Sequence, residues 1–368
     1  MFCFLQLKRK SKKHNILNIY FNFTKILLLK KKINIKTIAS DLGVSPSTVS
    51  KALKDSHEIS EPTKERIRVY AKLHNYRPNS LAKGLRNQKT NVLGIIIPEI
   101  VDHFFSRVLY GIESIAYKND YNLMICLSKD NIEKEINNIE MLTNGNVDGL
   151  LVSVAKETLN LKEYDHFQQL IDRKFPLVFL DRVPDELEID KVMIDDVEGG
   201  YIAAKHLLEK GCKNIAIIAT STNISSSINK EKGFRKALKE YNNPINEDFC
   251  LKVIKKGKED VTPQIETLFN DRNFPDGIFT VNENYAAIVI KIATKKGLNI
   301  PKDIKIIAFT DGMISKNISP ALTTIAQHGY TMGAQATELL MNRISSKNDT
   351  NPFKINVVGT DVVEREST

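Results

Sequence analysis

Short apolar runs alternate with amphipathic stretches from Val92 to Phe309, and this alternation limits the possible folds more than any other feature of the chain. The runs are rich in Ile, Leu and Val, as in strands that are buried on both faces. The expected strands are Val92–Ile97, Asn122–Leu127, Gly149–Val154, Leu177–Leu180, Val192–Ile194, Ile215–Ile218, Gly277–Val281 and Ile304–Phe309. The expected helices are Phe105–Tyr117, Ile132–Asn144, Tyr164–Lys174, Gly199–Lys210, Lys230–Tyr241, Val261–Asn270 and Tyr285–Lys296. Such alternation predicts parallel sheets covered by helices. These strands and helices are too many for a single sheet of ordinary size. We therefore expect two doubly wound α/β subdomains with a ligand-binding cleft at the carboxyl ends of their strands.

The preceding residues 33–86 follow the pattern of three short helices. The first is expected after the cap Asn34 and ends at Gly43, and the second has Ser45 as its cap with Pro46 at the first helical position. A third helix is expected to begin near Ser60. Their buried faces would consist of Ile35, Ile38, Ala39, Leu42, Val49, Ala52, Leu53, Ile67, Tyr70, Ala71 and His74. This is the helix-turn-helix pattern of a small all-α DNA-binding domain.

The outer face of the second helix is polar and cationic, because the helical period places Ser47, Lys51 and Lys54 together there. A three-helix bundle with a solvated lysine face is the alternative explanation. The charge distribution favours a nucleic-acid partner. Residues 1–91 contain 20 Lys and Arg against 5 Asp and Glu, a net charge of +15, which leaves −6 for the rest of a chain whose total is +9.

Residues 78–91 form a basic connection that contains a possible short helix. Leu81 and Leu85 would share one face with Ala82 beside them, and Lys83 and Arg86 would flank it. So short a helix, below the roughly 12 residues that an isolated helix needs, requires something else to order it. A flexible linker whose leucines rest on a neighbouring surface is the alternative.

The sequence lacks the common signatures of enzymes and of metal or cofactor sites. No nucleotide-binding G-x-G-x-x-G or G-x-x-x-x-G-K-[ST], no G-x-S-x-G and no H-E-x-x-H occurs. The four cysteines are scattered without a C-x-x-C pair, which fits a reducing cytoplasm and suggests neither zinc nor disulfides. We therefore expect no catalytic residues, no cofactor and no metal.

Residues 1–32 combine basic residues with an apolar stretch that Asn18, Asn22 and Lys25 interrupt. No small-residue cleavage site follows, and a bilayer span needs a cleaner run of about 20 apolar residues. We expect a disordered basic tail or a start codon placed too early, and no membrane partner.

Several motifs together resemble the lactose-repressor-like (LacI/GalR) family of transcription regulators. They are the segment Ile35–Leu53, NYRPNSLAKGLR, VDGLLV at Val147–Val152, DDVEGGYIAAKHLLEKG at Asp195–Gly211 and SPALTTI at Ser319–Ile325. The resemblance runs from about Ile33 to the C-terminus. It implies a helix-turn-helix domain over 33–77, a hinge helix and linker over 78–91, and an effector-binding and dimerisation domain of the periplasmic-binding-protein type over 92–368. The chain would cross three times between subdomain N, about 92–193 plus 325–350, and subdomain C, about 194–324 plus 351–368.

The resemblance also implies which residues contact DNA. Pro46, Ser47 and Lys51 match positions that face base edges in the major groove, where Lys suits the O6 and N7 acceptors of guanine. Leu85, with Ala82 packed alongside and Arg86 next to it, matches the leucine that relatives insert into the minor groove at the centre of a palindromic operator.

The effector-binding residues that the resemblance implies lie at the expected cleft: Phe104, Phe105, Asp181, Lys230, Glu283, Thr310 and Asp311. The two phenylalanines would form an apolar floor, or else two core aromatics that open a helix. Glu283 matches an acidic family position, or else caps the following helix.

Two departures from the family pattern affect the effector. Lys230 stands where many relatives have arginine, and Thr310 stands where many have aspartate, with Asp311 one place later. Lysine lacks the bidentate fork of arginine, and threonine cannot accept two hydroxyl groups as a carboxylate does. We therefore expect a carbohydrate or a related small polar metabolite rather than the ligand of one particular relative.

We favour the hypothesis of a cytoplasmic, sequence-specific transcription regulator, expected to be a repressor, that binds a double-stranded DNA operator as a homodimer under effector control. One alternative is a periplasmic-type solute-binding protein without a regulatory role, which the helix-turn-helix pattern disfavours. The second alternative is an enzyme with this fold, which no sequence motif supports.

Overall fold

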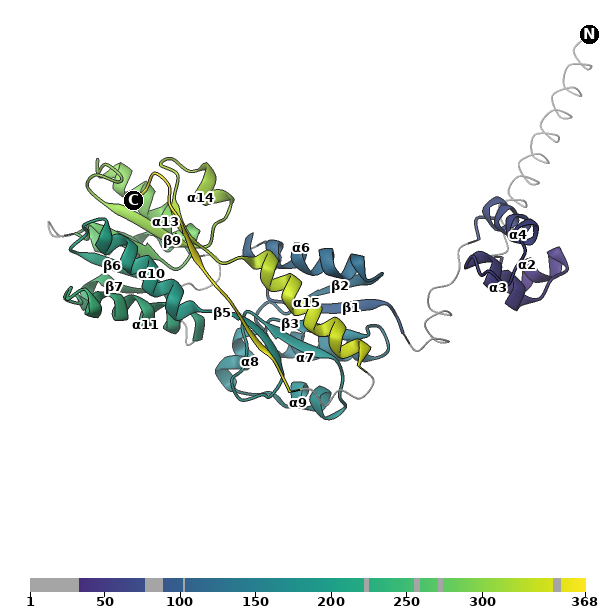
Figure 1. Ribbon diagram of the computed structural model, residues 1–368. Helices are drawn as coiled ribbons and strands as arrows, with labels where there is room; N and C mark the ends of the chain where they lie inside the picture. Colours follow the sequence, from purple (N-terminus) through teal and green to yellow (C-terminus); the bar gives the residue numbers. More distant parts are fainter. Residues whose placement is uncertain are drawn as a thin grey trace, which may run out of the picture. The chain divides into compact units, whose positions relative to one another are not determined.

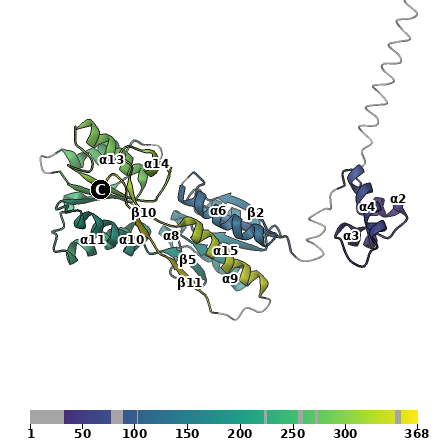
Figure 2. The same cartoon turned by 45° about the horizontal axis from the view of Figure 1, so that its top comes forward.

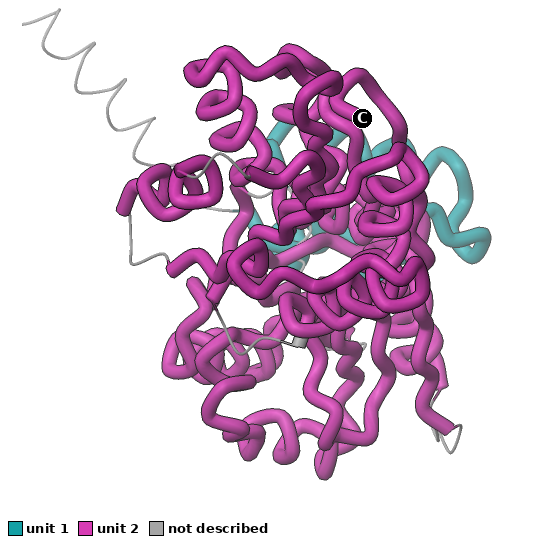
Figure 3. Tube along the Cα trace, turned by 90° about the vertical axis from the view of Figure 1, so that its left-hand side faces the viewer, with its two compact units in different colours: residues 1–88 teal, residues 89–368 magenta. Residues whose placement is uncertain are grey.

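The computed structural model describes residues 33–76, 89–101, 103–221, 225–254, 259–270, 274–346 and 352–368. The chain divides into two compact units, residues 1–88 and 89–368 (Figure 3). Each unit is described by itself, with the helix and strand labels of Figure 1.

The first unit contains the three expected helices: α2 (Ile35–Leu42), α3 (Pro46–Leu53) and α4 (Glu61–Leu73). The Asn34 side chain accepts hydrogen bonds from the backbone N–H groups of Lys36 and Thr37, and Gly43 ends α2 in the left-handed region at φ +67°. The Ser45 side chain caps α3 by accepting from the Thr48 N–H. One small core joins the helices: Ile38, Ala39, Val49, Ala52, Ile67 and Ala71.

The first sheet of the second unit has six parallel strands in the order β11-β5-β4-β3-β1-β2. They are β1 (Val92–Ile97), β2 (Asn122–Leu127), β3 (Gly149–Val152), β4 (Leu177–Leu180), β5 (Asp190–Ile194) and β11 (Ile355–Val358). Side chains alternate across this sheet, so Ile95 packs with one core and Ile96 with another. Helices α6 (His103–Lys118) and α15 (Gly329–Ser345) contribute to the first core, and α7 (Ile132–Thr143) and α9 (Asp165–Asp172) to the second (Figure 1). The short α8 (Lys156–Leu161) follows β3.

The second sheet also has six strands, in the order β12-β10-β9-β8-β6-β7, of which only β12 runs antiparallel to its neighbour. They are β6 (Ile215–Thr220), β7 (Cys250–Val253), β8 (Gly277–Thr280), β9 (Lys305–Phe309), β10 (Thr323–Ala326) and β12 (Asp361–Val363). The accompanying helices are α10 (Asp196–Glu209), α11 (Ser225–Glu240), α12 (Thr262–Glu266), α13 (Glu283–Lys295) and α14 (Met313–Asn317). The helix expected over Val261–Asn270 is instead α12 followed by a 3-10 turn over Thr267–Phe269.

The chain passes between the two sheets three times: after β5, between β10 and α15, and between β11 and β12. The crossings after Ile194 and Ala326 lie close to the expected ones near residues 194 and 325, but the third expected boundary is wrong. Because β11 pairs with β5, residues 355–358 belong to the first sheet, and the third crossing comes after Val358 instead of near residue 351.

Helices α10 and α11 approach each other closely because glycines lie at their crossing. A Cβ atom at Gly200 would stand 2.0 Å from the Lys230 carbonyl oxygen, and one at Gly233 would stand 1.8 Å from the Val197 carbonyl oxygen. No other residue fits at these two positions without moving the helices. The close approach brings Lys230 of α11 to the first turn of α10.

Among the residues described, no helix has the length and apolar content that a membrane crossing requires.

Candidate DNA-binding surface and effector site

The expected DNA-contacting residues of α3 lie on its exposed side. Pro46, Ser47 and Lys51 are exposed, whereas Val49 and Ala52 on the opposite side are fully buried. The Ser47 hydroxyl lies 2.7 Å from the Ser45 hydroxyl. This hydrogen bond ties the exposed Ser47 to the cap of the helix, which fixes a donor and acceptor group at its first turn.

The other expected DNA contacts, Ala82, Leu85 and Arg86, lie outside the described residues, as does most of the segment 78–91.

Phe104 and Phe105 lie in the first turn of α6, the helix that follows β1 in the chain, and both belong to the buried core. They are 7% and 4% exposed, and their ring centroids lie 5.4 Å apart at an interplanar angle of 64°. Both rings therefore contribute to the core, and their role as an apolar floor of the effector site stays a prediction.

Asp181 follows β4 at the carboxyl edge of the first sheet. Its backbone is in the left-handed region at φ +62°, and its carboxylate accepts a hydrogen bond of 3.2 Å from the Ser153 hydroxyl. Burial raises the pKa of the Asp181 carboxyl to about 6, although the neighbouring Arg182 and Lys230 act in the opposite direction and Asp196 acts in the same one. Lys230 and Asp196 belong to helices of the second sheet, so charged groups from both subdomains converge here.

Lys230 contacts several of the groups that meet at this junction. Its ammonium donates a hydrogen bond of 2.6 Å to the Asp196 carboxylate and another to the Ser226 hydroxyl, and it lies 4.3 Å from the centroid of the Phe309 ring. The Lys230 side chain is only 7% exposed and that of Asp196 only 15%. A buried lysine with these partners holds a positive charge at the junction of the subdomains.

The remaining three expected residues follow strands of the second sheet. Thr310 lies after β9 at φ +84°, which is strained for a β-branched residue, and its hydroxyl bonds to the Gln327 side chain. The Asp311 carboxylate contacts Arg365 and Lys316. Although burial acts to raise it, these two cations hold the pKa of Asp311 below its usual value. The negative charge of Asp311 is thus already paired with cations of the protein itself.

Glu283 does not cap the helix that follows β8. Asn282 caps α13 by accepting from the Tyr285 N–H at 2.9 Å. The buried Glu283 carboxylate instead accepts from the N–H and the hydroxyl of Ser315, at 3.1 and 2.8 Å. It therefore holds α14 against α13, and the capping alternative is wrong.

Three further residues at the same strand ends were not predicted from the sequence. Asp196 and Ser153 are partners of the expected site residues, and Ser128 follows β2 with a buried hydroxyl that has no hydrogen-bond partner among the described residues. Only Asp196 had a usable signal, the Asp195-Asp196 pair directly after a strand.

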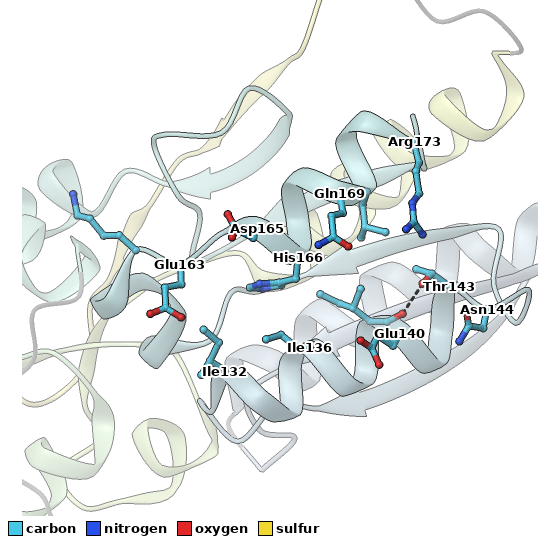
Figure 4. A pocket seen from close by; sticks show the side chains of 13 residues that line it. Ile132, Ile136, Glu140, Thr143, Asn144, Glu163, Asp165, His166, Gln169 and Arg173 are labelled. Carbon is cyan, nitrogen blue, oxygen red and sulfur yellow. Dashed lines mark hydrogen bonds between the residues drawn. The ribbon is translucent and has the colours of Figure 1, made fainter.

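A pocket of about 670 Å³ lies between α7 and α9, and none of the expected effector residues lines it (Figure 4). One lining residue, His166, bonds through Nε2 to the buried Glu135 carboxylate at 3.1 Å. Glu135 also accepts from the Ala155 N–H and the Thr158 hydroxyl, each at 2.6 Å. These contacts join α7, α8 and α9, so the lining residue His166 has a structural role.

The raised pKa of Asp181 predicts a pH-dependent effect of its charge on stability. Between about pH 4 and pH 6 the folded state binds more protons than the unfolded state, so stability falls as the pH rises through this window. Asp181→Asn is expected to raise the free energy of unfolding by roughly 2 kcal/mol at pH 8 and by much less at pH 4. Urea denaturation at both pH values measures this. The exposed Glu338→Gln serves as the charge control, and an equal effect of Asp181→Asn at both pH values would contradict the prediction.

Comparisons with known proteins agree on the family. Residues 34–79 match the family described as bacterial regulatory proteins, lacI family, and residues 204–368 match a periplasmic binding protein-like domain. The HTH-type transcriptional repressor PurR of Histophilus somni is 32% identical over 314 residues, which are 85% of this chain and 92% of that protein. The HTH-type transcriptional regulator DegA of Bacillus subtilis is 31% identical over 307 residues, 83% of this chain and 89% of that protein.

Solved structures show the same fold. The lac repressor dimer bound to operator superposes with a TM-score of 0.77 at 20% identity and covers 92% of this chain and 99% of that one. A LacI family regulator from Enterococcus faecium with bound ribose gives a TM-score of 0.66 at 26% identity, over 75% of this chain and 98% of that one. The helix-turn-helix unit, the two α/β sheets and these relatives establish that the chain belongs to the lacI family of bacterial regulatory proteins and is a DNA-binding transcription regulator, not an enzyme.

Proposed function

We propose that the protein is a repressor that binds a palindromic operator as a homodimer, with α3 in the major groove and its Ser47 and Lys51 side chains at base edges. The exposed polar face of α3 opposite the buried Val49 and Ala52 carries this proposal. We assign residues 33–77 to DNA binding, 78–91 to a hinge helix and 92–368 to effector binding and dimerisation. Such a regulator acts on DNA in the cytoplasm.

Exposed apolar side chains support the homodimer. Tyr110 and Tyr117 of α6 are 58% and 77% exposed, and Met124 and Ile125 of the neighbouring strand β2 are also exposed. Strand β2 ends the first sheet, and α6 lies beside it (Figure 2). A second copy that packs against this surface would bury the apolar groups, and a two-fold dimer matches the symmetry of a palindrome.

The effector that fits best is a carbohydrate or a related small polar metabolite. Asp181 and Ser128 follow β4 and β2 at the carboxyl edge of the first sheet, and Lys230 of α11 bonds to Asp196, which follows β5. Within the described part of the chain, the buried Ser128 hydroxyl has no hydrogen-bond partner. The Asp181 carboxylate accepts hydrogen bonds and the Lys230 ammonium donates them, so together they complement the hydroxyl groups of a sugar, which do both. Relatives at 26% identity bind ribose and D-xylulofuranose.

Effector binding would act through the three crossings between the sheets. A ligand that contacts both subdomains favours one angle between them, and this angle sets the spacing of the two hinge helices in the dimer. The fraction of dimers that can bind the operator then rises or falls with ligand concentration.

Lys51→Ala is expected to relax base preference at one operator position by about 1–3 kcal/mol, because it removes the donor to guanine. Selection of bound duplexes from a randomised pool, followed by competition binding, measures this. An unchanged preference in the variant would refute the assignment of Lys51.

The effector assignment is tested by a thermal-shift panel of pentoses, hexoses, disaccharides and nucleobases on the wild-type protein. A sugar that raises the melting temperature supports the proposal. A shift by nucleobases alone would refute the carbohydrate class.

A further inference from the structure

Glu58 forms an ion pair with Lys51, the α3 residue that we assign to a base contact. Glu58 lies in the turn between α3 and α4, seven residues after Lys51, and both residues are exposed. An acidic side chain therefore lies on the surface that meets a polyanion.

This ion pair has little value for stability. The two side chains are 47% and 52% exposed, and surface pairs of this kind contribute between nothing and about 1 kcal/mol. A contribution to stability therefore does not explain why Glu58 is acidic.

The turn that carries Glu58 is nevertheless well fixed. The Ser56 N–H donates to the Lys51 carbonyl oxygen at 3.0 Å, and the Ile59 N–H donates to the Ser56 carbonyl oxygen at 3.2 Å. Asp55 holds the same turn to α4 through Lys64 at 3.0 Å and Arg68 at 2.5 Å. The carboxylate is therefore held in position beside α3.

The chemistry of the pair suits a guanine–cytosine base pair. An ammonium group has three donors, so Lys51 can keep its bond to Glu58 and still donate to guanine O6 and N7. A carboxylate has two oxygen atoms, so Glu58 has acceptor capacity left for the N4 amino group of cytosine. Both contacts lie on the major-groove edge of one base pair or of two adjacent ones.

We propose that Glu58 is a specificity-determining residue, which positions the Lys51 ammonium and accepts a hydrogen bond from cytosine in the operator. This inference rests on the proposed groove contact of α3. Away from the operator, the carboxylate faces phosphates without the cytosine donor, so Glu58 disfavours non-specific complexes.

The test compares Glu58→Gln with wild type in selection from a randomised pool and in competition against non-specific duplex. Glu65→Gln, which removes the same charge from an exposed position of α4, is the matched control. We expect Glu58→Gln to lower discrimination at the affected base pair about tenfold and to strengthen non-specific binding. Glu65→Gln is expected to leave discrimination unchanged.

Two outcomes separate this inference from the proposed function. If Lys51→Ala relaxes the base preference and Glu58→Gln does not, the role of Glu58 is refuted and the groove contact stands. If neither variant changes the preference, both are refuted. Non-additivity, in which Lys51→Ala combined with Glu58→Gln loses no more discrimination than Lys51→Ala alone, would support the shared contact.

Discussion

Lys230→Met is expected to lower the free energy of unfolding by about 3 kcal/mol, measured by urea denaturation at pH 7. The substitution keeps an unbranched side chain of similar length but removes the charge that neutralises Asp196, whose side chain is 15% exposed. A buried carboxylate without its partner is costly, and the Ser226 hydroxyl loses its donor as well. The same variant is expected to lose the thermal shift that an effector sugar gives the wild type.

Two further variants test this explanation. Lys205→Met removes a lysine of α10 whose side chain is 41% exposed and whose ammonium lies 3.8 Å from Glu209, and it is expected to change stability by less than about 0.5 kcal/mol. The double variant Lys230→Met with Asp196→Asn removes both charges and should recover part of the loss. If Lys230→Met cost no more than Lys205→Met, the buried pair would not stabilise the α10–α11 contact.

The predicted fold was confirmed where one face of an element is buried and its period is visible in the sequence. The outward side of α3 followed from the spacing of Val49 and Ala52, and most inner strands followed from their continuous apolar runs. Strands β7, β11 and β12 were not predicted because they lie at sheet edges, where partly exposed residues break the apolar run. The inner strand β10 was also missed, because Thr323 and Thr324 make up half of its four residues. Helix α15 was also missed. It packs on α6 through Gly333, where a Cβ atom would stand 2.0 Å from the Val108 carbonyl oxygen, and no local pattern shows such a contact.

The candidate effector site was harder to predict than the fold, because side-chain partners depend on tertiary contacts. Arg365 lies 54 residues from Asp311, and Ser315 lies 32 residues from Glu283. The spacing of residues in the sequence does not indicate that these two carboxylates already bind partners within the protein. Asp181 and Lys230 remain the two expected residues whose charges meet between the subdomains.

Leu85→Ala is expected to weaken operator binding on the order of 100-fold, because it removes the apolar side chain that would enter the minor groove. Leu85 lies outside the described residues, so its role is a proposal from the family resemblance. Fluorescence anisotropy with the selected operator, at a fixed salt concentration, measures the loss. Binding to a random duplex is expected to change less than about twofold, because no charge is removed.

Leu85→Met distinguishes an inserted side chain from a simple linker. Methionine keeps a long apolar side chain, so this variant is expected to retain most of the operator affinity that Leu85→Ala loses. A hinge that folds on the operator also couples the two units, since the dimer can hold both hinge helices at the minor groove only at one spacing. Equal operator affinity of Leu85→Ala and wild type would favour the flexible linker and would end the DNA-binding part of the chain at the third helix.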